Sequence, residues 1–205
     1  MAEHTLNIIL DMEWEMFDRV QNIGGRASCQ DNRETFYINR SSQLMAWDGE
    51  VLESYARDLR RARLEGRNLL SEKYGYMMQR TSPEEYEAIR DRLPVRSEEK
   101  LELMERICKA HLVWLREVSE CYPHLTGRGR AMERAEDSPF TTSFETYLWG
   151  ELGTYSLPTL QLYWQQVVRI QQEGGNMNRD ILRNTVTQYG YPSLEAAEER
   201  LANGR

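Results

Sequence analysis

The stretch "FETYLWGELGTYSLPTLQLYW", residues Phe144 to Trp164, decides the fold class because its large apolar side chains recur every three or four positions. At about 100° per residue, four of them share one face of a helix: Phe144, Leu148, Leu152 and Tyr155. The stretch divides near Ser156 to Pro158, which predicts two successive helices. Two glutamates, Glu145 and Glu151, border the shared face, so we expect carboxylates next to the core.

The same helical spacing runs through almost the whole chain. The expected helices cover residues 3–21, 33–47, 50–80, 97–121, the two halves of 144–173, 178–190 and 193–201. Residues 50–80 form either one long helix or a pair divided near Gly66, and "TFYI" within 33–47 is also compatible with a short strand. "SPEE" predicts Ser82 as an N-cap, with Pro83 in the first helical position and Glu85 closing a capping box. The sequence therefore predicts an all-α fold.

We expect a single-domain multi-helix bundle over residues 1–205, because the chain is long enough for one sizeable core. Apolar residues make up 40% of the chain and charged residues 29%, which is typical of a packed globule. The segment "PHLTGRGRAMERAEDSP", near residues 123–139, is rich in glycine, proline and charge. It predicts a flexible surface loop.

Composition also narrows the function classes. A formal net charge of −7 disfavours general nucleic-acid binding, since that affinity depends on neutralising phosphates. The first residues, "MAEHTLNIIL", lack the basic start of a secretory signal, and no apolar run approaches the roughly 20 residues of a membrane span. We expect a cytoplasmic protein that binds neither nucleic acid nor membrane.

Glu13 is a second anomalous carboxylate. The apolar stripe of its helix consists of Leu6, Ile9, Leu10, Phe17 and Val20, and Glu13 projects from the middle of that stripe. An ionised carboxylate among apolar groups needs hydrogen bonds or a cation, and otherwise it takes up a proton. Candidate partners on the apolar faces of other helices are Arg40, Gln43 and Lys73.

We predict that several helices contribute to one buried or cleft-lining polar network, with these members: Glu13, Arg40, Gln43, Lys73, Glu145 and Glu151. Tyr147 and Tyr155 join the candidate substrate-binding residues because both neighbour Glu151 along their helix. One interpretation is a binding or catalytic site. The other is a set of satisfied ion pairs that fixes the register of the helices.

Four segments resemble the signature blocks of a bacterial family catalogued as domain of unknown function 4125: "EWEMFDRVQNIGGRASCQ", "SYARDL", "GRNLLSEKYGYMM" and "TSFETYLWGELGTYSLPTL". The resemblance covers residues 13–176 and implies no particular activity. Members of the family are sometimes joined to a nucleotidyltransferase-like domain, which implies small-molecule metabolism or modification and a partner of that kind. The blocks contain Glu13, Arg26, Cys29, Gln30, Asn68, Lys73, Glu145 and Glu151, without assigning them roles.

Motifs for metals and nucleophiles are weaker. Two Cys-x-x-His pairs have residue types suited to zinc: Cys108 with His111, and Cys121 with His124. A continuous helix would hold residues 108 and 121 roughly 20 Å apart, so we predict no metal site from these residues. Magnesium binding by carboxylates alone stays open. Cys29, near Arg26 in "GGRASCQ", is either a nucleophile or an incidental thiol.

The resulting hypothesis is a small-molecule enzyme that performs carboxylate acid/base chemistry in a bundle cleft, on an anionic metabolite. Glu13 or Glu151 would act as the acid or base, while Arg40 and Lys73 would hold the anion and the other network members would orient them. The cofactor is unknown. The alternative is a noncatalytic helical module that binds a metabolite or a protein, such as a nucleotidyltransferase-like domain.

Overall fold

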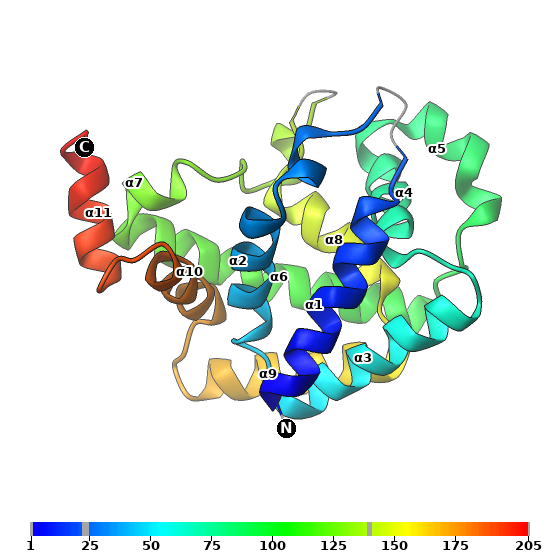
Figure 1. The fold of residues 1–205 in the computed structure, drawn as a ribbon, viewed down its shortest axis with the longest axis horizontal. Coiled ribbons are helices and arrows are strands. Elements are labelled where there is room, and N and C mark those ends of the chain that lie inside the picture. The colour runs from blue at the N-terminus through cyan, green and yellow to red at the C-terminus, as the bar shows by residue number, and fades with distance from the viewer. Residues whose placement is uncertain (1, 22–24, 139–140, 205) are drawn as a thin grey trace.

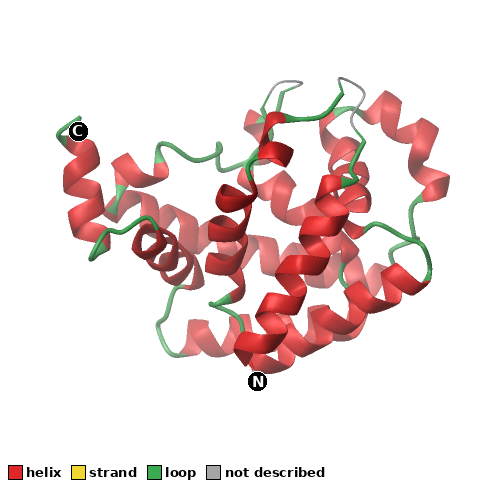
Figure 2. Ribbon diagram, viewed as in Figure 1, coloured by secondary structure: helices red, strands yellow, loops and turns green. Residues whose placement is uncertain are grey.

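The computed structural model describes residues 2–21, 25–138 and 141–204, and within these ranges it contains eleven α-helices and no β-strand (Figure 2). This confirms the predicted all-α bundle. No helix in the described ranges is both long and apolar enough to cross a lipid bilayer. The α-helices are α1 Ala2–Asp18, α2 Arg33–Leu44, α3 Gly49–Leu64, α4 Leu69–Thr81, α5 Pro83–Ile89, α6 Glu98–Cys121, α7 Pro123–Thr126, α8 Phe144–Thr154, α9 Leu157–Gln172, α10 Met177–Gln188 and α11 Leu194–Ala202.

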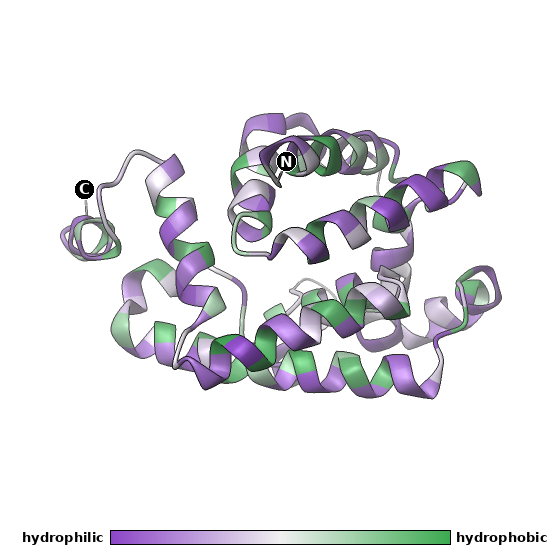
Figure 3. Cartoon of the chain, turned by 90° about the horizontal axis from the view of Figure 1, so that it is seen from below, coloured by the Kyte–Doolittle hydropathy of each residue, from purple (hydrophilic) through white to green (hydrophobic). Residues whose placement is uncertain are grey.

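Most helices pack around one apolar core. Helix α1 packs against α2, α3 and α4, helix α8 packs against α4 and α6, and α9 packs against α3 and α6 (Figure 1). Figure 3 shows hydrophobic and hydrophilic residues alternating along the helices, as expected for helices that bury one face. This arrangement brings α1, α2, α4 and α8 together, although α8 lies far from the others in sequence.

A small second cluster lies at one end of the molecule, where α7, α10 and α11 meet (Figure 1). Its buried side chains are Val186, Leu194 and Ala197, and Tyr122, Leu125, Leu182 and Tyr191 pack against them. The cluster fastens the C-terminal helices to the end of α6. It also places α10 beside α2, near the predicted site.

Most helix boundaries follow the local signals in the sequence. Residues 50–80 form a pair of helices, because Gly66 adopts a left-handed φ of 69° after α3 and Asn68 caps α4 by accepting from the amides of Leu70 and Ser71. "TFYI" is helical within α2. Helices α1 and α2 end at Asp18 and Leu44, earlier than the apolar pattern predicts.

The capping box predicted at Ser82 is wrong in its side-chain part. Ser82 does precede α5, and Pro83 does occupy the first helical position. However, the Ser82 side chain makes no capping hydrogen bond. Ser82 is also the C-cap of α4, and its amide donates to the carbonyl of Met78, so one residue ends the first helix and begins the next.

The segment predicted as a flexible loop contains short helices within its described residues, 123–138. These are α7 and the 3₁₀ helix η3, Arg134–Glu136. The carbonyls of Ala131 and Met132 accept from the first amides of α8, at Phe144 and Glu145. Pro139 lies outside the described residues. The flexibility of the segment stays a prediction.

Candidate functional site

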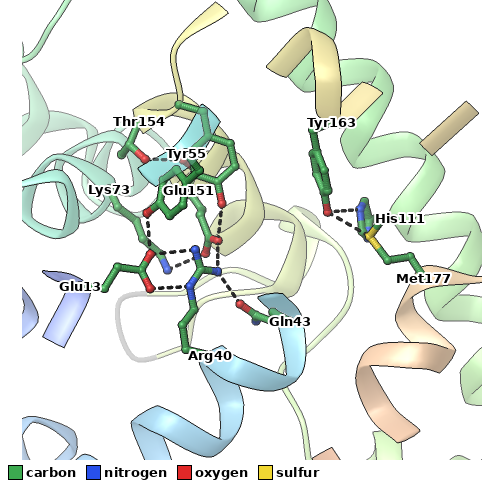
Figure 4. A network of polar contacts seen from close by, with 11 residues as sticks. Glu13, Arg40, Gln43, Tyr55, Lys73, His111, Glu151, Thr154, Tyr163 and Met177 are labelled. Atoms are coloured by element: carbon green, nitrogen blue, oxygen red, sulfur yellow. Dashed lines mark hydrogen bonds and ion pairs between the residues drawn. The ribbon is translucent and has the colours of Figure 1, made fainter. Parts of the chain in front are cut away.

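Glu13 lies in the buried stripe of α1, as the sequence predicts, and its side chain is 2% exposed. Arg40, on α2, donates to both of its carboxylate oxygens, from Nε at 2.6 Å and from Nη2 at 2.8 Å (Figure 4). The hydroxyl of Tyr55, on α3, donates to Oε1 at 2.5 Å. This two-point contact between a guanidinium and a carboxylate is strong and fixes the orientation of both groups. The buried charge of Glu13 is therefore fully partnered.

Glu151, on α8, is the second buried carboxylate, and it joins α8 to α2 and α4. Arg40 Nη1 donates to its Oε1 at 2.6 Å, and Lys73 Nζ, from α4, donates to its Oε2 at 2.9 Å (Figure 4). The hydroxyl of Tyr155 donates to Oε1 at 2.6 Å. The same guanidinium thus contacts Glu13, Glu151 and Gln43, whose Oε1 accepts from Nη1 at 2.7 Å. We call these seven residues the charged network: Glu13, Arg40, Gln43, Tyr55, Lys73, Glu151 and Tyr155.

The electrostatics of the charged network keep the ion pair between Glu151 and Lys73 charged. Burial raises the pKa of the Glu151 carboxyl, but the positive charges of Arg40 and Lys73 outweigh burial and hold that pKa well below its usual value. Burial lowers the pKa of Lys73, and the negative charge of Glu151 reverses this, so the ammonium is retained. Burial raises the pKa of Tyr155, which keeps its hydroxyl a donor. The Glu151 side chain consequently stays ionised and is a weak base.

Tyr147, also on α8, lies beside two cations. The Lys73 ammonium is 3.6 Å from the centre of its ring, and the Arg130 guanidinium is 4.4 Å from the same point. Arg130 comes from the 123–138 segment, where its Nη1 also donates to the carbonyl of Thr142. Tyr147 therefore connects the buried network to a cation near the surface.

Glu145 is the one predicted network member that lies elsewhere. Its carboxylate accepts from the backbone amide of Arg134 at 2.9 Å and lies 3.6 Å from Nη1 of Arg80. These contacts join the start of α8 to α4 and to the 123–138 segment. The helical projection placed Glu145 at the margin of the apolar face, and that margin turns toward Arg80 and not toward Arg40 or Lys73.

The charged network forms part of the wall of a cavity of about 540 Å³, which we call the polar cavity. A volume of this size is typical of small-molecule sites. Its charged lining residues are Glu13, Arg40, Lys73, Arg130 and Glu151, and Gln43, Tyr55, Tyr74 and Tyr147 also line it. Five of the six predicted network residues thus meet at one cavity, and so does Tyr147.

Tyr55 and Arg130 are the site residues that sequence reasoning missed. Tyr55 has a local signal, because it shares a buried face of α3 with Leu52, Leu59 and Ala62 and carries a polar group into that face. Arg130 has no such signal. It lies in an irregular segment, and only the folded chain brings it to Tyr147.

Three residues from the resembling blocks fasten the C-terminal end of α1. The side-chain Nε2 of Gln30 donates to the backbone carbonyls of Phe17 and Val20, at 2.8 and 3.0 Å. The side-chain Nδ2 of Asn68 donates to the backbone carbonyl of Met16 at 2.7 Å. Arg26 donates to the carbonyl and the carboxylate of Asp18, and this side chain also pairs with Asp31. These residues position α1, and with it Glu13.

The cysteines and histidines do not converge. No group of three or more His, Cys, Asp or Glu side chains suited to a metal ion occurs within the part of the chain that the structure describes. Cys108 and His111 are buried in α6, whereas Cys121 and His124 are exposed, and His124 pairs with Glu198. Cys29 is exposed and lines the polar cavity.

Comparison with known proteins extends the resemblance seen in the sequence. A family model described as "Protein of unknown function (DUF4125)" matches residues 3–199. No curated protein matches the chain, and no solved structure matches it. The matched range contains the whole charged network and Arg130, so the site lies inside the region that defines the family.

Proposed function

The chain belongs to the DUF4125 family, whose description names no activity, and we propose that it binds a small molecule through an anionic group in the polar cavity. The observation that carries this proposal is the charge of the cavity wall. Glu13 and Glu151 are compensated by Arg40 and Lys73, and Arg130 is a further cation on the same wall. Among the described ion pairs, none joins Arg130 to a carboxylate.

Hydrogen-bond donors support the same proposal. An ammonium carries three N–H donors, and Glu151 accepts one from Lys73. The Arg130 guanidinium carries five, and the carbonyl of Thr142 accepts from one of its nitrogens. Buried carboxylates hold Arg40 and Lys73 in place, so an anion entering the cavity meets donors that are already oriented. Such preorganisation reduces the entropy lost on binding.

Enzymatic acid/base chemistry is the second candidate, and one observation favours it. Glu13 and Glu151 both line the cavity, within reach of a bound molecule. Against Glu151 as the base stands its low pKa, since a carboxylate held by two cations accepts a proton poorly. In this second candidate Glu13 or Glu151 transfers the proton, with Arg40 and Lys73 holding the anionic metabolite.

A thermal-shift screen tests the binding proposal, because a ligand that binds only the folded chain raises its melting temperature. The panel contains anionic metabolites with phosphate, carboxylate or sulfate groups. The variant Arg130→Ala is compared with Arg128→Ala, which removes an exposed arginine that does not line the cavity. We expect Arg130→Ala to weaken binding of a hit about tenfold, as for loss of one charged hydrogen bond. Equal affinity in all three proteins, or no anionic hit, contradicts the proposal.

The resemblance supports a setting for this activity. We propose a bacterial, cytoplasmic protein that does not bind nucleic acid and that works with a nucleotidyltransferase-like protein. The net charge of −7 supports the exclusion of nucleic acid. Size-exclusion chromatography of the purified chain, mixed with a nucleotidyltransferase-like protein from the same organism, tests the partnership by joint elution. Separate elution at micromolar concentrations counts against it.

A further inference from the structure

A second cavity, of about 510 Å³, lies next to the polar cavity and differs from it in chemistry. Its walls come mainly from α2, α6, α8 and α10. We call it the aromatic cavity, since apolar and aromatic side chains dominate its lining, among them Trp47, Leu115, Val118, Phe144, Leu148 and Tyr163. A wall of this kind favours an apolar or aromatic group over a hydrated one.

Three polar residues of the aromatic cavity, His111, Asn178 and Tyr163, are joined to one another. Nδ1 of His111 lies 2.7 Å from the side-chain oxygen Oδ1 of Asn178. Nε2 of His111 lies 2.9 Å from the hydroxyl of Tyr163 (Figure 4). The side-chain Nδ2 of Asn178 donates to the His111 backbone carbonyl, which fixes the orientation of the Asn178 side chain. Burial lowers the pKa of His111 to about 4, so the ring is neutral near pH 7. His111 therefore adds no charge to this wall.

The two cavities share part of their lining. Five residues belong to both: Asn39, Gln43, Arg130, Tyr147 and Glu151. Arg130 and Glu151 are the only charged residues among the described lining of the aromatic cavity, and both lie on this shared wall. The charge is thus concentrated where the cavities adjoin, and the aromatic cavity becomes apolar away from it.

We infer that the two cavities form one bipartite site for an amphipathic anion, with the charged group in the polar cavity and an aromatic or aliphatic body in the aromatic cavity. This inference rests on the proposed function, because it takes the anion at Arg130 and Lys73 as given. It names the ligand class: an aryl or alkyl compound that carries one phosphate, sulfate or carboxylate group. A small hydrophilic anion would leave the aromatic cavity unused.

Charge placement supports one ligand over two separate ones. Arg130 lines both cavities. A ligand whose anionic group contacts Arg130 can therefore extend its remaining atoms into the aromatic cavity. Tyr147 also lines both cavities, and its ring lies beside the two cations, Lys73 and Arg130. A single amphipathic molecule satisfies both walls.

Three probes separate the parts of the site: inorganic phosphate, 1-naphthyl phosphate and 1-naphthol. Isothermal titration of the wild type is expected to give at least tenfold tighter binding of 1-naphthyl phosphate than of either other probe, since burying the ring adds apolar contact. Thr185→Phe, on α10, fills the aromatic cavity. We expect it to remove that tenfold gain and to leave phosphate binding unchanged.

Thr187→Phe is the matched control for Thr185→Phe. Both threonine hydroxyls donate to the carbonyl four residues earlier in α10, but Thr187 is exposed and lines neither cavity. A second pair of variants is used in case Thr185→Phe does not fold. Leu115→Trp fills the same cavity from α6, and Val113→Trp, at an exposed position of the same helix, is its control. Circular dichroism melts verify that each variant is folded.

The outcomes distinguish the two proposals. If phosphate binds and loses affinity in Arg130→Ala, but 1-naphthyl phosphate gains nothing over phosphate, then the bipartite inference is wrong and the proposed function stands. If 1-naphthol binds as tightly as 1-naphthyl phosphate and Arg130→Ala affects neither, then anion recognition fails and the inference fails with it. Equal loss in Thr185→Phe and Thr187→Phe also contradicts the inference.

Discussion

Gly150 on α8 lies against the backbone of Lys73 on α4, so closely that a Cβ atom at Gly150 would be 2.7 Å from the Lys73 carbonyl oxygen and 2.5 Å from Cγ of Met77. Real Cβ atoms do not approach a backbone atom at that distance. The two helices that carry Lys73 and Glu151 therefore meet at a position where only glycine fits.

Gly150→Ala is expected to force α4 and α8 apart and to destabilise the fold by about 1–3 kcal/mol, the usual cost of overpacking a core. The measurement is the free energy of unfolding from urea titration. Gly49→Ala is the matched control, because a Cβ there meets no atom within 4 Å. The control is expected to be neutral or slightly stabilising. Equal effects of the two substitutions would show that the helices adjust without cost.

Glu13→Gln separates the catalytic from the structural role of the charged network. The amide keeps the size of Glu13 but removes the charge that Arg40 contacts at two points, so we expect a loss of stability of about 3–5 kcal/mol. If Glu13 also transfers protons, the folded variant binds its ligand yet loses most of its turnover. The checks are urea unfolding, ligand titration and an activity assay once a substrate is identified.

Glu15→Gln, on the exposed side of the same helix, is the control for this experiment. It removes a surface charge near Arg63 and is expected to change stability by less than about 1 kcal/mol. Wild-type turnover in Glu13→Gln would exclude Glu13 as the acid or base, and wild-type stability would contradict the structural role as well.

The free energy of unfolding is expected to decrease as the pH is lowered, because of the titration of His111. Its pKa is about 4 in the folded chain and about 6.5 when unfolded, so the unfolded chain binds the proton more tightly between these values. The stabilisation is complete above about pH 6.5 and is lost as the pH falls toward 4. Between pH 7 and about pH 4.5 we expect a loss of about 2 kcal/mol.

His111→Gln should be less stable near pH 7, because a buried hydrogen-bonded ring is replaced, but this part of its pH dependence should disappear. Urea titrations at the two pH values measure the difference. His4→Gln, at an exposed position of α1, should retain the wild-type pH dependence. The same slope in wild type and His111→Gln would assign the effect to other groups.

The segment 127–138 is expected to exchange its amide hydrogens faster than α6 and α8. Its described hydrogen bonds within the segment are short-range turns, such as Glu136 to Glu133 and Asp137 to Arg134, and such turns open locally at low cost. Hydrogen exchange followed by mass spectrometry provides the measurement. Protection equal to that of the flanking helices would contradict the flexible-loop prediction. Added ligand should slow exchange near Arg130 if the binding proposal is correct.

Much of the fold was predictable because it depends on local signals. The apolar period of Phe144 to Tyr155 and the break near Pro158 are readable without tertiary contacts, and so is Pro83 at a helix start. The missing side-chain cap at Ser82 was not predictable, since the same residue is the C-cap of α4.

The candidate site was partly predictable for a different reason. A carboxylate in an apolar stripe requires a partner, so the sequence placed Glu13, Arg40, Lys73 and Glu151 in one network. In the structure Arg40 pairs with Glu13, and Lys73 pairs with Glu151. The rule does not say which partner a marginal residue finds, and Glu145 meets Arg80 instead. Arg130 could not be found in this way, because an arginine in an irregular, polar segment needs no partner.

The order of the charged residues along the chain has a consequence for synthesis. Glu151 follows Lys73 by 78 residues and Arg40 by 111, so both cations leave the ribosome well before the carboxylate that they share. A nascent chain that ends before α8 can pair Arg40 with Glu13, but Lys73 lacks its carboxylate, and burying its charge is unfavourable. The first four helices are therefore expected to close fully only after α8 has been translated. Truncated products that lack α8 should remain unfolded and be degraded by proteases.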